Sequence, residues 1–185
     1  DGKSLLQQEN KLIQEVDQII CVSETLRDSI RSRGRESSLL THGVDVSFWK
    51  SPSDTVDRDE FNLPLDKPFA LFWGVIDRRM NADWLIELAN QLVDGFIVLA
   101  GPTQDPDPRI LEHNRIHLLG PVAFHSLPDL ATLAKVLIMP YADLPVTRAM
   151  QPLKLKEYHQ EGHQNNAAYN CSSTLLCYIL FCFLH

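Results

Sequence analysis

Residues 147–158, TRAMQPLKLKEY, hold the densest set of groups that can bind an anion or a sugar. Pro152 suits the first turn of a helix, where its missing N–H costs no hydrogen bond. The backbone N–H groups of such a turn attract phosphate, and Arg148 and Lys154 add positive charge. The carboxylate of Glu157, more than one turn further on, can accept hydrogen bonds from sugar hydroxyls. The segment suits a phosphorylated sugar or a nucleotide. The alternative is a surface helix with solvated charges.

A pair of arginines, Arg78 and Arg79, follows an apolar run at 69–76. Two guanidinium groups at the end of a strand can bind a diphosphate through paired hydrogen bonds. The alternative is a solvated loop. Asp105 and Asp107 are better explained as turn-forming residues than as metal ligands. No His or Cys pair in the first 160 residues has convincing metal-binding spacing.

Three common motifs are absent from the sequence: GxGxxG after a strand, GxxxxGK[ST] and GxSxG. Their absence argues against a classical dinucleotide enzyme, a P-loop NTPase and an α/β-hydrolase.

The elements that must position these groups alternate between strand and helix. The apolar runs at 96–100 and 116–119 are each followed by Gly-Pro, and the run at 136–139 is followed by Pro. Apolar residues at helical spacing lie between 84 and 92. This alternation predicts an α/β fold with a parallel sheet. Ligands bind at the carboxyl ends of the strands in such sheets, and both chemical segments follow strand ends.

Shorter elements are predicted nearer the N-terminus. Residues 5–16 form an amphipathic pattern typical of a helix, and 18–22 and 38–41 are short strands. Ser23 is the predicted N-cap of a second helix that stops at Gly34. Cys21 is predicted to be a buried, inert thiol.

The composition has a break near residue 160. The chain has 185 residues and a formal charge of −7, which makes it a poor binder of nucleic acid or anionic membrane. All charged side chains precede residue 162, and three of the four cysteines lie beyond it. The apolar run at 175–184 is shorter than the roughly 20 residues of a membrane span. The N-terminal residues lack the basic segment followed by an apolar segment that is typical of a signal peptide. We therefore expect a cytoplasmic protein with no membrane span.

Taken in order, these segments resemble the C-terminal half of the nucleotide-sugar glycosyltransferases of the GT-B type (glycosyl transferases group 1, the retaining family 4 class). The matching stretches are DQIICVSETL at 17–26, HGVDVSFW at 42–49, FWGVIDRRMNADWLIELA at 72–89, FIVLAGP at 96–102, RIHLLGPVAFHSLPDL at 115–130, VLIMPY at 136–141 and RAMQPLKLKEY at 148–158.

The resemblance implies a partial GT-B fold built from Rossmann-like domains. Residues 1–50 would be the end of the acceptor-side domain and the crossover, and 51–67 a linker or loop. Residues 68–158 would be a partial donor-binding domain, and 159–185 a tail foreign to the fold. The partners implied are a nucleotide-diphosphate sugar and an unknown acceptor.

The resemblance also assigns roles within the donor site. Glu157 would hold the ribose hydroxyls. The backbone at Pro152 and Leu153 and the charge of Lys154 would lie near the phosphates, with Arg148 close by. Arg79, or else Arg78, would neutralise the departing diphosphate, since fixed cations stabilise developing negative charge. No metal and no cofactor are expected.

The sequence departs from the family pattern at three places. Ala149 replaces an earlier glutamate, Lys135 replaces an aspartate, and the buried strand expected after Tyr158 is missing. We therefore expect a glycosyltransferase fragment that has little or no transfer activity alone, with a tail that would fit a frameshift. The catalytic acceptor-side residue is unknown. The alternative is a non-catalytic α/β binding or interaction module. A flavodoxin-like regulatory domain loses ground, because no acidic cluster follows a first strand.

Overall fold

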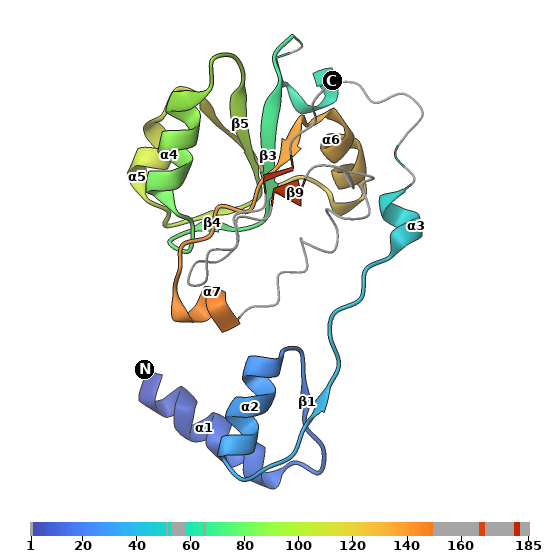
Figure 1. The fold of residues 1–185 in the computed structure, drawn as a ribbon, viewed down its shortest axis with the longest axis vertical. Helices are drawn as coiled ribbons and strands as arrows, with labels where there is room; N and C mark the ends of the chain where they lie inside the picture. The colour runs from blue at the N-terminus through green and yellow to red at the C-terminus, as the bar shows by residue number, and fades with distance from the viewer. Residues whose placement is uncertain are drawn as a thin grey trace. The chain divides into compact units, whose positions relative to one another are not determined.

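The computed structural model describes residues 2–50, 52, 58–64 and 66–149, together with the short antiparallel strands β9 (Ala167–Ala168) and β10 (Leu180–Phe181). Among these residues the chain divides into two compact units, one formed mainly by residues 2–44 and the other mainly by 45–148 (Figure 1). No helix in the described ranges combines the length and the apolar character needed to cross a membrane.

The first unit holds two helices and two short strands. They are α1 (Gly2–Glu15), β1 (Ile20–Cys21), α2 (Glu24–Ser32) and β2 (Ser38–Leu39). The two strands pair in parallel, with Ile20 opposite Ser38. The predicted N-cap is confirmed, because the Ser23 hydroxyl accepts a hydrogen bond from the Leu26 N–H. The predicted burial of Cys21 is also confirmed.

Arginine side chains tie the elements of the first unit together. The Arg35 guanidinium donates to the carbonyl oxygens of Ile13, Gln14 and Val16 at 2.7, 2.8 and 2.6 Å. A cation at the C-terminal end of α1 complements the helix dipole there. Arg33 joins α2 to α1 through Asn10 at 3.1 Å and Glu9 at 3.3 Å.

The second unit is built on a four-stranded parallel sheet in the order β7-β5-β3-β8. Its strands are β3 (Phe69–Trp73), β5 (Phe96–Ala100), β7 (Ile116–Gly120) and β8 (Val136–Leu137). Every residue of β3 and β5 is buried, as expected for parallel strands covered on both faces. Helices α4 (Ala82–Gln91) and α5 (Pro108–Glu112) lie on one side of the sheet and α6 (Leu127–Leu133) on the other (Figure 1). The predicted α/β fold with a Rossmann-like parallel sheet and flanking helices is confirmed.

The predicted single strand at 69–76 is wrong in one respect, because it breaks after Trp73. A short strand, β4 (Ile76–Asp77), resumes beyond the break and pairs in parallel with β6 (Thr103–Gln104). At the break Gly74 has a φ of 141°, which favours glycine. A Cβ on Gly101 would collide with the carbonyl oxygen of Gly74. The two glycines therefore allow the ends of β3 and β5 to approach closely.

Residues 45–49 pack within the second unit. Asp45 caps α3 (Val46–Trp49), and Trp49 stacks on Trp73 with ring centroids 5.4 Å apart. In the sequence between Trp49 and β3, the helical turn η1 (Arg58–Phe61) contacts α6. Phe61 and Leu63 are buried. The assignment of 1–50 to an acceptor domain and of 51–67 to a linker stays a prediction.

Candidate functional site

The candidate site lies at the carboxyl edge of the sheet, where the chain leaves β3 and β8. The helix that follows β3, α4, covers one face of the sheet, and the helix that precedes β8, α6, covers the other (Figure 1). The connections therefore change face between these adjacent strands, and ligands bind at such switch points in open α/β sheets. The two strand ends are joined by backbone hydrogen bonds. The N–H of Ala142 donates to the carbonyl oxygen of Arg79, and the N–H of Asn81 donates to that of Pro140, both at 2.7 Å. Met80 and Tyr141 form an isolated β-bridge.

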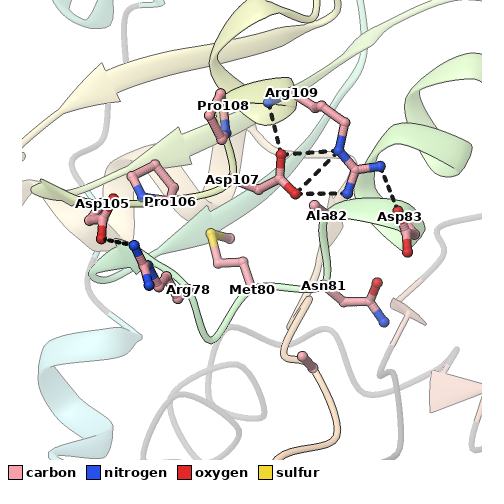
Figure 2. A pocket seen from close by; sticks show the side chains of 11 residues that line it. Arg78, Met80, Asn81, Ala82, Asp83, Asp105, Pro106, Asp107, Pro108 and Arg109 are labelled. Carbon is pink, nitrogen blue, oxygen red and sulfur yellow. Dashed lines mark hydrogen bonds and ion pairs between the residues drawn. The ribbon is translucent and has the colours of Figure 1, made fainter.

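A cavity of about 690 Å³ opens beside this junction. It is lined by the loop from β4 to α4, by the loop from β6 to α5, and by Ala142 after β8 (Figure 2). The residues that line it include Arg78, Asp83, Asp105, Asp107 and Arg109. Its size is that of a small-molecule site, and its walls carry charges of both signs.

Arg109 engages two of the carboxylates in this cavity. Its guanidinium contacts Asp107 at 2.7 Å and Asp83, at the start of α4, also at 2.7 Å (Figure 2). The hydrogen bonds from Arg109 hold the pKa of Asp107 below its ordinary value. Asp107 also caps α5 by accepting from the Arg109 N–H, and Asp105 has a left-handed φ of 53°. Their prediction as turn-forming residues is confirmed. These contacts position α4 against α5.

The two arginines predicted after β3 lie at this edge but contact different carboxylates. Arg78 pairs with Asp105 at 2.6 Å, and both side chains are largely exposed, at 80% and 73% (Figure 2). Arg79 pairs with Asp77 at 2.6 Å, and these side chains are only 32% and 19% exposed. Arg79 is therefore the less exposed of the two cations and the one with more hydrogen bonds to its carboxylate.

Asp77 contacts Arg79 at the switch point, and Tyr141 interacts electrostatically with both. Hydrogen bonds from Arg79 hold the pKa of Asp77 below its ordinary value, and the same pair raises the pKa of Arg79. Burial raises the pKa of Tyr141, and the positive charge of Arg79 partly opposes that shift. The Tyr141 ring packs edge-on against Phe72 of β3. The cluster joins the exits of β3 and β8 through side chains as well as backbone.

Thr147, in α7 (Pro145–Ala149), closes the turn that leads away from β8. Its hydroxyl is buried, accepts from the N–H of Leu144 at 2.9 Å and donates to the carbonyl oxygen of Ala142 at 2.6 Å. Sequence reasoning missed Thr147, Asp77 and Tyr141 as site residues. The spacing of Asp77 two residues before Arg79 was a usable signal, because Asp side chains bind the backbone two residues on.

The remaining predicted residues lie further along the chain. Arg148 belongs to α7, and only its place in the helix is described. Four others fall outside the described residues: Pro152, Leu153, Lys154 and Glu157. Within the part of the chain that the structure describes, no group of three His, Cys, Asp or Glu side chains is arranged to hold a metal ion.

Comparison with known proteins gives matches among solved structures. No protein-family profile matches the chain, and none of the curated proteins does so. Sucrose-phosphate synthase from Thermosynechococcus elongatus matches with a TM-score of 0.65 and 21% identity, over 84% of this chain and 41% of that one. HepE from Anabaena, in complex with UDP and glucose, matches with a TM-score of 0.68 and 16% identity, over 88% and 47%. HepE in complex with UDP-glucose matches with a TM-score of 0.64 and 16% identity, over 83% and 45%.

These neighbours are GT-B glycosyltransferases. At such identities the likeness shows the fold, and the chain has the fold of part of a GT-B protein. The resemblance drawn from the sequence is confirmed at that level. The chain spans less than half the length of the solved structures that it matches.

Proposed function

We propose that this chain carries the donor-binding part of a nucleotide-sugar glycosyltransferase. The observation that carries the proposal is the extended match to HepE, which was solved in complex with UDP, UDP-glucose and glucose. A second supporting observation is that Arg79, at the switch point of the sheet, is held by Asp77. The nucleoside diphosphate binds at the carboxyl edge between β3 and β8.

In this proposal Arg79 supplies the cation for the diphosphate. Glycosyl transfer builds negative charge on the departing diphosphate, and a positioned guanidinium stabilises that charge. The segment after α7 completes the site: Lys154 and the backbone at Pro152 and Leu153 bind the phosphates, while Glu157 binds the ribose hydroxyls. Arg78 and Arg148 add positive charge at the rim. The donor binds without a metal.

Transfer itself needs groups on the acceptor side of a cleft. We propose that the chain by itself binds the donor and transfers little sugar. Measurable turnover of UDP-glucose by the purified chain would contradict this part of the proposal.

Calorimetric titration of the full chain with UDP, GDP and ADP tests the donor site. We expect one of the three to bind, and Arg79→Ala and Glu157→Ala each to weaken binding by about 10- to 100-fold, because each variant removes a charged hydrogen-bonding partner. Arg31→Ala is the matched control, since Arg31 is an exposed arginine of α2 in the first unit. No binding of any nucleotide, or indifference to both variants, would favour a non-catalytic binding or interaction module.

A further inference from the structure

The contact between Asp77 and Arg79 is unusually complete for two residues so close in the chain. The carboxylate accepts from the Arg79 backbone N–H at 2.9 Å and from Nε at 3.0 and 2.9 Å, and Nη2 lies 2.6 Å from Oδ2. One carboxylate therefore holds both the backbone and the guanidinium of the same residue. By contrast, the Arg78–Asp105 pair is a single contact between largely exposed side chains.

Both members of the pair are anchored to the frame of the sheet. Asp77 lies in β4 and is paired with Gln104 of β6. The carbonyl oxygen of Arg79 accepts from Ala142, beyond β8. The guanidinium is thus held relative to both strands that form the switch point.

A fixed arginine binds a diphosphate more tightly than a mobile one. A free arginine side chain has high rotamer entropy, and immobilising it when the ligand binds reduces the affinity. Because of the bidentate contact with Asp77, the Arg79 side chain loses this rotamer freedom when the protein folds rather than when the ligand binds. The same contact sets the plane of the guanidinium.

We propose that Asp77 is a positioning residue for the donor diphosphate, acting through Arg79. This inference rests on the proposed function and deepens it. Asp77 itself makes no contact with the nucleotide, and it orients the guanidinium that does.

The direction in which nucleotide affinity changes when Asp77 is removed distinguishes a positioning role from an effect of its negative charge alone. A carboxylate beside a diphosphate site repels the ligand, so its removal should strengthen binding if charge alone mattered. If Asp77 acts by orienting Arg79, its removal weakens binding.

The test is a double-mutant cycle on UDP binding by the full chain, with GDP or ADP substituted if one of them is the nucleotide bound. We expect Asp77→Ala to weaken binding about 5- to 10-fold and to have no further effect in the Arg79→Ala background, because coupled residues are not additive. Asp77→Asn keeps a carbonyl acceptor and should recover part of the loss. Asp28→Ala is the matched control, since Asp28 pairs with Arg31 on the surface of α2.

Far-UV circular dichroism first establishes that each variant is folded, and Asp77→Asn serves alone if Asp77→Ala is not. Stronger or unchanged binding by the Asp77 variants, while Arg79→Ala weakens it, overturns the inference and leaves the proposed function standing. An equal loss from Asp77→Ala with and without Arg79 overturns it as well. A wild-type chain that binds no nucleotide overturns both.

A second measurement reads the positioning without a nucleotide. In ¹⁵N spectra of the full chain we expect the Nε–H of Arg79 to exchange slowly with water, and the Asp77 variants to lose this protection. Exchange as fast as that of the exposed Arg31 in the wild-type chain would overturn the inference.

Discussion

The two units of this chain bury their apolar residues to very different extents. In the second unit both central strands are buried along their whole length and helices cover the two faces of the sheet (Figure 1). In the first unit only Ile13, Cys21 and Ser23 are buried among the described residues. Several of its large apolar side chains are exposed: Leu5, Leu6, Leu12, Ile20 and Leu40.

This difference shows where the stability of the candidate site originates. Apolar burial is the main favourable term in folding, so the sheet of the second unit supports the loops that hold Arg79 and the neighbouring cavity. The first unit relies more on the hydrogen bonds and ion pairs of Arg33 and Arg35. Exposed ion pairs contribute little to stability.

The largest expected effect tests where the second unit begins. Trp49 is 1% exposed and stacks on Trp73, so Trp49→Ala should lower the free energy of unfolding by about 3–5 kcal/mol. Val46→Ala in the same helix is the control, because Val46 is exposed. Urea denaturation measures both. Equal, small losses would show that residues 45–49 do not contribute to the core of the second unit.

A matched pair of leucines compares the two units directly. Leu99→Ala, in β5, should cost about 2–5 kcal/mol, because Leu99 is fully buried. Leu12→Ala, in α1, should change stability by no more than about 0.5 kcal/mol, since Leu12 is exposed. Thermal and urea unfolding of the two variants give the comparison. A loss at Leu12 equal to that at Leu99 would contradict it.

Thr147 tests the turn between β8 and α7. Thr147→Val keeps the shape of the side chain but leaves the N–H of Leu144 and the carbonyl oxygen of Ala142 without this partner. We expect a loss of about 1–3 kcal/mol in the free energy of unfolding. Thr132→Val, at an exposed position of α6, is the control. A neutral Thr147→Val would show that the hydroxyl does not brace the turn.

The smallest effect concerns the pH dependence of the Asp77–Arg79 pair. Because the folded pKa of Asp77 lies below its ordinary value of 3.8, the ionised carboxylate stabilises the fold fully above that value. This stabilisation is lost as the pH falls through the folded pKa. Wild type should therefore exceed Asp77→Asn by up to about 1 kcal/mol near neutral pH. Urea denaturation from about pH 6 to about pH 2 should show the difference shrinking. A constant difference would contradict the ion pair.

Much of the fold was predictable because its signals are local. The apolar run at 96–100 is strand β5 as predicted, and Ser23 caps α2 as predicted. The break after Trp73 was missed, because Gly74 is surrounded by apolar residues and its unusual φ depends on the approach of β5.

The candidate site was predictable only in part. Arg78 and Arg79 are adjacent and chemically identical, and the local feature that distinguishes them is Asp77, two residues before Arg79. The partner of Arg78 follows from the pairing of β4 with β6, which brings Asp105 to it. The partner of Arg79 is local, because Asp77 lies two residues before it.

The order of residues alone therefore determines the alternation of strands and helices, the helix caps and the edge of the sheet where a ligand would bind. These features depend on contacts within a few residues of one another and on the burial of apolar runs. Only the tertiary structure decided that Ala142 hydrogen-bonds to Arg79 and that Tyr141 pairs with Met80. Those contacts depend on β8 returning beside β3, and no local pattern encodes the approach of two strands so far apart in the chain.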